Sequence, residues 1–104
     1  MQLSESEQAS GSGASAITRK LTIVNKRGLH ARAAAKLVTL AERFGAAVDV
    51  SKDGQEVSAR SIMGLMMLGA GIGSTIELRA EGWDAKEAMD AIAGLIEAGF
   101  DEHD

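Results

Sequence analysis

Hydrophobic and polar residues follow regular periods between residues 18 and 100, and these periods predict the secondary structure. In Arg19–Val24, Leu21 and Ile23 alternate with polar neighbours, as in a half-buried strand. From Ala31 onward the period lengthens, because apolar residues recur at i, i+3, i+4 and i+7 on one face of a helix. The residues of this face are Ala34, Leu37, Val38 and Ala41. Gly45 is expected to end the helix in a left-handed conformation.

The next segments predict a hairpin and a short helix. Two alternating stretches, Ala47–Ser51 and Glu56–Ala59, flank Asp53-Gly54, a dipeptide typical of tight hairpin turns. Ser61 then occupies the N-cap position of an apolar helix, Ile62–Leu68, where its hydroxyl can accept a hydrogen bond from a free backbone N–H.

A glycine-rich stretch at residues 69–73 separates this helix from the next alternating segment. Nucleotide-binding loops follow a strand and open a helix, whereas this stretch follows a helix and precedes a strand. We therefore expect Gly69 to cap the helix and the remaining glycines to form a tight connection. In the strand Ser74–Ala80, Ile76 and Leu78 are expected to face inward.

The last segment predicts a third helix. Asp84 and Glu87 have the spacing of a capping box, and Gly99 is placed to end the helix. Its apolar stripe comprises Ala88, Ala91, Ile92 and Leu95. The order of elements is therefore βαββαβα. This order suits an α+β fold in which a four-stranded, mainly antiparallel sheet carries three helices on one face.

A chain of 104 residues is the length of one domain. Residues 1–17 are rich in Ser, Gly and Gln and predict a disordered arm, residues 18–100 the folded domain, and residues 101–104, DEHD, an acidic tail. The absence of cysteine excludes disulfides, thiolate zinc sites and cysteine nucleophiles. No segment resembles a signal peptide or reaches the ~20 apolar residues of a membrane span, so we expect a cytoplasmic protein.

Charge is unevenly distributed along the chain, although the net charge is only −4. Residues 18–43 hold seven basic residues and one acid, while residues 44–104 hold four basic residues and twelve acids. The basic segment is either ordinary solvated charge or a face that attracts an anionic ligand or an acidic partner. The net negative charge, with one Trp and two Phe, argues against nucleic-acid binding.

His30 lies just before the first helix, where unpaired backbone N–H groups and the positive end of the helix dipole meet. A phosphoryl group on this imidazole would be stabilised there, and Arg32 offers a planar fork for its oxygens. The alternative is that His30 is an N-cap or surface residue without a task. The other histidine, His103, lies in the acidic tail, and no metal site or cofactor is expected.

Two motifs resemble the HPr family, the histidine-containing phosphocarriers of the bacterial phosphoenolpyruvate-dependent phosphotransferase system. NKRGLHARAAAKLV matches the active-site signature at Gly28, Leu29, His30, Ala31, Arg32 and Ala34. SARSIMGLMMLGAGIGSTIEL matches the regulatory-serine region at Ser61, Ile62, Met63 and Gly64. The resemblance covers residues 18–100 and implies an HPr-like open-faced β-sandwich.

The resemblance also implies a role for each matching residue. His30 would accept phosphoryl on Nδ1 from phospho-enzyme I and pass it to a histidine of a IIA protein or domain, with Arg32 binding the phosphoryl group. The protein would be a monomeric carrier and not an enzyme. Its docking surface for partners would comprise Leu29, Ile62, Met63 and Met66.

Ser61 resembles the serine that an HPr kinase/phosphorylase modifies in part of the family. Phosphate there would bring about −1.5 to −2 charge into the docking surface and weaken docking. The alternative is that Ser61 is only an N-cap. Another open alternative is a non-catalytic, serine-switched interaction module of the same fold, although the presence of both His30 and Arg32 disfavours it.

Ala33 departs from the family, which usually has proline at this position. Alanine is a strong helix former, so we expect the helix to persist with one additional N–H donor near the phosphate. The ending EAGFDEHD and the stretch HARAAAKL resemble the nitrogen-related branch of the family, whereas RSIMGLMMLG is closer to the sugar-type branch. A regulatory relay is weakly favoured over sugar uptake.

Overall fold

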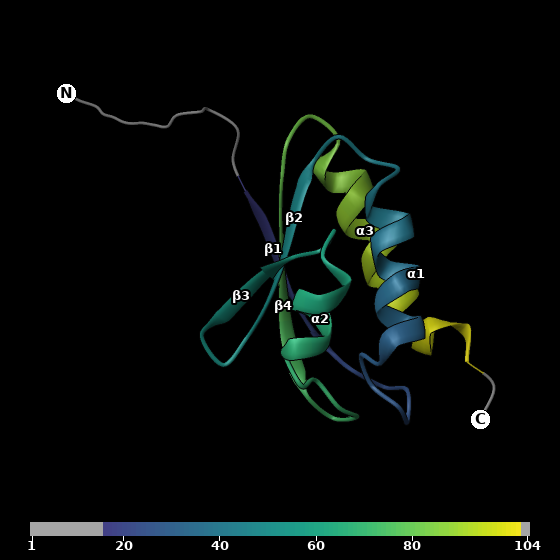
Figure 1. Ribbon diagram of the computed structural model, residues 1–104. Helices are drawn as coiled ribbons and strands as arrows, with labels where there is room; N and C mark the ends of the chain where they lie inside the picture. The colour runs from purple at the N-terminus through teal and green to yellow at the C-terminus, as the bar shows by residue number, and fades with distance from the viewer. Residues whose placement is uncertain (1–15, 103–104) are drawn as a thin grey trace.

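Residues 16–102 are described by the computed structural model, in which one sheet carries the helices on a single face (Figure 1). Along the chain the elements are β1 (Ile17–Thr22), α1 (Ala31–Ala41), β2 (Ala47–Lys52), β3 (Gln55–Ser58), α2 (Ile62–Met67), β4 (Thr75–Glu81), α3 (Ala85–Glu97) and the 3₁₀ helix η1 (Gly99–Asp101). The predicted order βαββαβα is confirmed. Within the described residues, no helix is long and apolar enough to cross a membrane.

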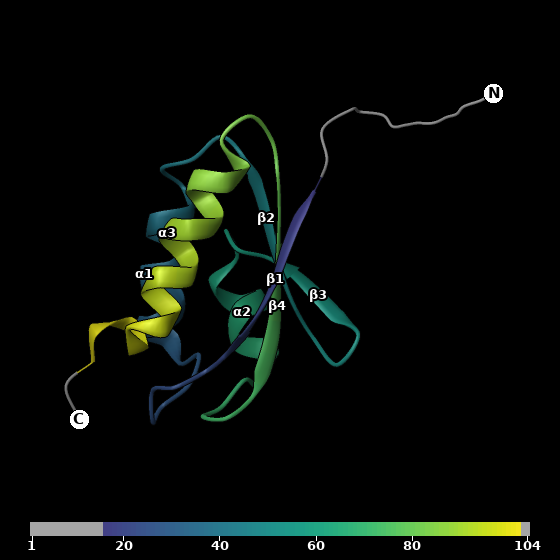
Figure 2. The ribbon, with the colours of Figure 1, turned by 180° about the vertical axis from the view of Figure 1, so that it is seen from behind.

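The strand order in the sheet is β1-β4-β2-β3, and each neighbouring pair is antiparallel. β4 therefore lies inside the sheet, with Ile76 opposite Leu21 of β1 and Leu78 opposite Val50 of β2. Seen from the front and from behind, α1 and α3 lie on the same side of this sheet (Figures 1 and 2). Within residues 16–102 the other face of the sheet carries no helix, as predicted for an open-faced sandwich.

The core lies between the sheet and the helices. Ile76 and Leu78 of β4 are at most 1% exposed, which confirms that they face inward. Small side chains on the helices are equally buried: Ala33 and Ala34 of α1, and Ala88 and Ala93 of α3. Alanine at these positions lets each helix backbone approach its neighbours closely, while larger side chains such as Leu37 and Ile92 fill the remaining space.

The predicted hairpin is confirmed. Asp53 and Gly54 both have positive φ, 51° and 82°, as the two central residues of a type I′ turn require. Lys52 pairs with Gln55 across this turn, so β2 and β3 each extend one residue closer to it than predicted. Gly69 also has the expected left-handed conformation after α2, with φ 64°.

Two predicted helix caps are wrong, although α3 does begin directly after Asp84 as expected. Helix α1 ends at Ala41, and its last turn tightens through i→i−3 bonds, so Gly45 is not a left-handed cap. Asp84 makes no capping bond to α3; its carboxylate instead accepts hydrogen bonds from the N–H groups of Gly45 (2.9 Å) and Ala46 (2.7 Å). This buried carboxylate therefore joins the loop after α1 to the start of α3.

The chain enters the sheet earlier than predicted. Ile17 pairs with Ala80 at the start of β1 and packs against the core, whereas Val24 is half exposed. The predicted arm, residues 1–17, therefore overlaps the start of β1. One isolated isoleucine carries no periodic signal from which the sequence could predict this. Residues 1–15 lie outside the described residues.

The buried face of α3 also differs from the prediction. Ala88 and Ile92 are buried as expected, but Ala91 and Leu95 are only half buried. Met89, Ala93 and Ile96 are buried in their place, so the face that meets the core is rotated relative to the predicted stripe. The predicted end at Gly99 is confirmed by its φ of 65°.

Replacing Asp84 by Ala should lower the free energy of unfolding by about 1–3 kcal/mol, because the N–H groups of Gly45 and Ala46 lose their acceptor. Urea denaturation measures the change. Asp90→Ala is the matched control: its carboxylate pairs with Arg19 and Lys86 on the surface, where water screens the ion pairs, so this substitution should destabilise the fold less than Asp84→Ala. Equal effects of the two substitutions on the free energy of unfolding would contradict a stabilising role of the hydrogen bonds that Asp84 accepts.

Candidate functional site

The turn between β1 and α1 holds His30 in place. Gly28 has φ +64°, and a Cβ at this position would lie 2.4 Å from the carbonyl oxygen of Ala70. Only glycine fits both constraints. The next residue, Leu29, donates its N–H to the same Ala70 carbonyl at 2.9 Å. The start of α1 is therefore fixed against the loop that follows α2.

His30 is the N-cap residue of α1, with an extended backbone (φ −77°, ψ 179°). Its carbonyl accepts the first helical bond, from Ala34 N–H at 2.9 Å, while its side chain makes no capping bond. The first turn of α1 contains no acidic residue. The N–H groups of this turn and the positive end of the helix dipole thus remain available to an anion beside the imidazole.

The imidazole has one carboxylate partner. Nε2 of His30 meets Oε2 of Glu102, and the side chains are 16% and 11% exposed. Among the described residues, Nδ1 has no hydrogen-bond partner. The hydrogen bond with His30, followed by one from Asn25, lowers the pKa of Glu102 from its ordinary value. Glu102 is therefore a carboxylate at neutral pH, and the ring nitrogen left for chemistry is Nδ1.

Asn25 connects this carboxylate to the turn. Its side chain is 6% exposed, and its Nδ2 donates to the Gly28 carbonyl at 2.9 Å and to Glu102 Oε1 at 3.1 Å. Its Oδ1 is buried without a partner among the described residues. The turn, residue 102 and the histidine thus form one network.

The segment that carries Glu102 is anchored and does not behave as the predicted acidic tail. Phe100 is fully buried, and the Lys36 ammonium donates to its carbonyl at 2.6 Å. The sequence predicts a turn at Asn25 and an acidic tail at Glu102, and it indicates no function for either residue. Contacts across 72 and 77 residues leave no trace in local periodicity. His103 lies outside the described residues.

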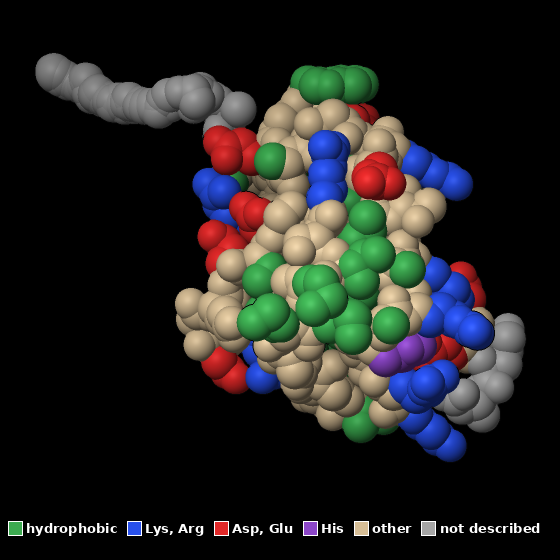
Figure 3. Space-filling model, viewed as in Figure 1, with side chains coloured by type: hydrophobic (Ala, Val, Ile, Leu, Met, Phe, Trp, Pro, Cys, Tyr) green, Lys and Arg blue, Asp and Glu red, His purple; other side chains and the backbone are tan. Residues whose placement is uncertain are grey.

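An exposed apolar surface lies beside the histidine, and we call it the α2 patch: Ile62, Met63, Met66 and Met67. These side chains are 39–68% exposed. In Figure 3, green apolar side chains gather next to the purple histidine, with blue basic side chains on its other side. Leu29, expected in the docking surface, is 5% exposed and belongs to the core instead, because its turn folds inward.

Ser61 is the N-cap of α2, as predicted. Its hydroxyl oxygen accepts a hydrogen bond from the Gly64 N–H at 2.9 Å. A side chain on Gly64 would begin 2.9 Å from this oxygen, so glycine leaves the space beside the hydroxyl open. The serine therefore lies at the edge of the α2 patch.

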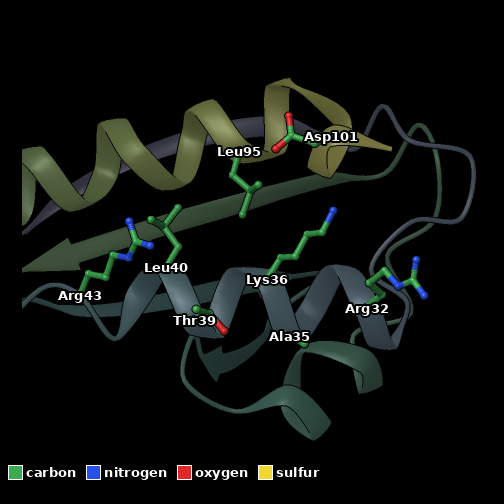
Figure 4. Close-up of a pocket in the computed structure, with 8 residues that line it drawn as sticks. All are labelled: Arg32, Ala35, Lys36, Thr39, Leu40, Arg43, Leu95 and Asp101. Carbon is green, nitrogen blue, oxygen red and sulfur yellow. The ribbon is translucent and has the colours of Figure 1, made fainter. Parts of the chain in front are cut away.

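Arg32 is exposed on the first turn of α1, two residues after the histidine. It lines one end of an open groove of about 400 Å³ between α1 and α3, which continues past Lys36 to Arg43, with Leu95 of α3 on the opposite wall (Figure 4). Asp101 also lines this groove, and Lys36 is committed to Phe100. At least one residue of the basic segment, Lys36, therefore holds the C-terminal segment in place.

Fold and site together define a small α+β domain with a partly buried histidine at the start of a helix. The family model described as "PTS HPr component phosphorylation site" matches residues 17–98. The chain is 55% identical to the phosphocarrier protein HPr of Cupriavidus necator over 86 residues, 83% of this chain and 97% of that protein. It is 49% identical to the phosphocarrier protein NPr of Shewanella violacea, over 83% of this chain and 94% of that one.

A solved structure supports the same assignment. HPr-C-His from Thermoanaerobacter tengcongensis superposes with a TM-score of 0.80 at 45% identity, covering 84% of this chain and 98% of that chain. The chain belongs to the HPr family of phosphocarrier proteins of the phosphotransferase system. It is thus a carrier of phosphoryl groups and not a catalyst.

The lowered pKa of Glu102 predicts a pH-dependent difference between the wild type and Glu102→Gln. Because the pKa is depressed in the folded state, the stability that ionised Glu102 contributes is complete above its ordinary value of 4.5 and is lost as pH falls through the lowered value. Urea unfolding across this range should show the advantage of the wild type over the variant shrinking below pH 4.5. A constant difference would contradict the contact.

Proposed function

We propose that the chain accepts a phosphoryl group on Nδ1 of His30 from phospho-enzyme I and passes it to a IIA protein or domain. The observation that carries this proposal is the position of His30, at the start of α1 with Nε2 occupied by Glu102 and Nδ1 without a partner among the described residues. In the transfer, the Nδ1 lone pair forms the N–P bond while the bond from phosphorus to enzyme I breaks, leaving its electron pair on enzyme I.

The surroundings supply what the phosphoryl group needs. Free N–H groups of the first turn of α1 point toward the position of the anion, and buried Ala33, in place of the usual proline, adds one more donor. Arg32, exposed two residues on, contributes a guanidinium that can bind two oxygens of the group at once. The chain acts as substrate and donor within a cytoplasmic relay, as a monomer.

The α2 patch is the proposed docking surface for both partners. Its four side chains are exposed, and apolar side chains gather beside the histidine in Figure 3. Arg32 is exposed on the first turn of α1. Methionine side chains are flexible and polarizable, so one surface can fit several partners in turn.

Ser61 is proposed as a regulatory phosphorylation site for an HPr kinase/phosphorylase. Phosphate on its hydroxyl would lie at the edge of the α2 patch and place about −1.5 to −2 charge where apolar partner surface must dock. The expected effect is weaker docking with an intact fold.

The proposed branch is the nitrogen-related regulatory relay. The segment EAGFDEHD, which resembles the nitrogen-related branch, supports it; in this segment Phe100 is buried and Glu102 contacts the histidine. The sugar-uptake carrier is the second candidate, favoured by the identity to HPr of Cupriavidus necator and by the stretch RSIMGLMMLG. The relative rates of transfer from the phosphorylated chain to a nitrogen-type and a sugar-type IIA protein distinguish the two.

The His30→Ala variant should accept no phosphate while keeping its fold, because the only removed group is the proposed acceptor. The purified chain is incubated with enzyme I, Mg²⁺ and phosphoenolpyruvate, and intact mass and acid lability are measured. The wild type should gain one acid-labile phosphate. With an enzyme I shown to be active on another carrier, an unmodified wild type or an equally phosphorylated variant would contradict the proposal.

Met63→Asp should raise the KM for this chain as a substrate of enzyme I by about tenfold or more with little change in kcat, because a charge is buried in the docking surface. Trp83→Ala is the matched control. Trp83 is 88% exposed and lies against Gly45, beyond the far end of α1. Similar KM values for the two variants would exclude the α2 patch as the docking surface.

A further inference from the structure

The network behind the histidine contains two side chains that neither bind the phosphoryl group nor contact a partner in the proposed transfer, Asn25 and Glu102. Asn25 Nδ2 donates to the Gly28 carbonyl and to Glu102 Oε1, and Glu102 Oε2 meets His30 Nε2. Through these contacts the turn before α1 is linked to Glu102, and Glu102 is linked to Nε2 of the histidine ring. They leave the opposite nitrogen, Nδ1, free.

The orientation of the Asn25 amide is determined by its neighbours. Both neighbours, the Gly28 carbonyl and the Glu102 carboxylate, are acceptors, so the NH₂ group must face them and Oδ1 must face away. In this orientation Oδ1 is buried without a partner among the described residues. A buried unpaired oxygen is rare and destabilising, so the two donated bonds are what holds the amide in place.

Glu102 is equally constrained. One carboxylate oxygen is engaged by Asn25 and the other by His30, and buried Phe100 two residues earlier fixes the backbone that carries it. An ionised carboxylate can only accept hydrogen bonds. The ring nitrogen that faces it must therefore carry a proton.

We propose that Asn25 and Glu102 are positioning residues that hold neutral His30 as the Nε2–H tautomer, with the Nδ1 lone pair directed to the incoming phosphoryl group. Asn25 acts through Glu102 and touches neither the ring nor the phosphoryl group. This inference rests on the proposed function, because it assigns the reacting nitrogen of the same histidine.

The arrangement also assists the transfer in both directions. When the Nδ1 lone pair forms the N–P bond, the ring becomes an N-phosphorylated imidazolium whose Nε2 proton stays hydrogen-bonded to Glu102. The carboxylate stabilises the positive charge that develops on the ring. When the N–P bond breaks during donation to the acceptor, its electron pair returns to Nδ1 and the ring leaves as neutral imidazole, so no proton has to be exchanged with solvent.

Replacing Glu102 by Gln makes a specific test, because an amide has only one oxygen. Asn25 cannot turn round, since its other N–H is held by the Gly28 carbonyl. The Gln oxygen must therefore accept from Asn25, and the Gln NH₂ group then faces His30 Nε2 and donates to it. This reverses the tautomer, placing the ring proton on Nδ1 and removing the nucleophilic lone pair.

The experiment is ¹⁵N NMR of the histidine ring in the unphosphorylated full-length chain at about pH 9, above the ordinary titration range of histidine. The wild type should show protonated Nε2 and unprotonated Nδ1, and Glu102→Gln should show the reverse. Asp101→Asn is the matched control, because it makes the same chemical change one residue away and Asp101 lines the groove between α1 and α3. Its ring spectrum should equal that of the wild type.

Phosphorylation rates form the second readout. Glu102→Gln should lower kcat for phosphoryl acceptance on the order of tenfold to a hundredfold, the range seen when metal-ligating histidines lose a carboxylate partner, while KM stays unchanged. Asn25→Ala should weaken the tautomer preference in the same direction. If burial of Asn25 makes that variant unfold, Glu102→Gln, at a residue outside the core, still decides the question.

A wild-type ring protonated on Nδ1, or a Glu102→Gln ring with an unchanged tautomer, would overturn the inference. Neither result depends on a partner protein, because the ring is observed without phosphate. Failure of the wild type to accept phosphate would instead contradict the proposed function. The two failures are therefore distinguishable.

Discussion

The close approach of Gly28 to Ala70 is the contact on which the site depends. A left-handed glycine without a side chain lets the turn before α1 lie directly on the loop after α2, and the Leu29 N–H closes the contact with a 2.9 Å hydrogen bond. This contact places the histidine of one segment beside the apolar patch of another. The proposed phosphoryl acceptor and the proposed docking surface are therefore placed side by side by a single backbone junction.

Most of the fold could be predicted because its signals are local. Three such signals are confirmed: the Asp53-Gly54 turn, the Ser61 cap, and the two-residue period that turns Ile76 and Leu78 inward. Each depends only on neighbours within a few residues. Gly45 and Asp84 were predicted wrongly for the opposite reason. The hydrogen bond between them spans 39 residues, so each residue taken alone has the features of an ordinary helix signal.

In the candidate site too, the residue with a local sequence signal could be predicted, and the residues that depend on distant contacts could not. His30 could be singled out because a helix start is visible in the sequence and because the motif around it resembles the HPr signature, and the structure places it at the N-cap of α1. Glu102 could not be identified, since an acidic cluster normally reads as a solvated tail. Its contact with the histidine depends on Phe100 entering the core and on Lys36 binding the Phe100 carbonyl. Asn25 contacts Glu102 only because residues 99–102 fold back in this way.

The central claim is that this chain carries phosphoryl on Nδ1 of His30. The most direct measurement is the ¹⁵N–³¹P coupling in the ¹⁵N-labelled chain after reaction with enzyme I and phosphoenolpyruvate, which identifies the atom bonded to phosphorus. The account predicts coupling to Nδ1 of His30. Coupling to Nε2, or phosphate attached to Ser61 with both ring nitrogens uncoupled, would contradict it.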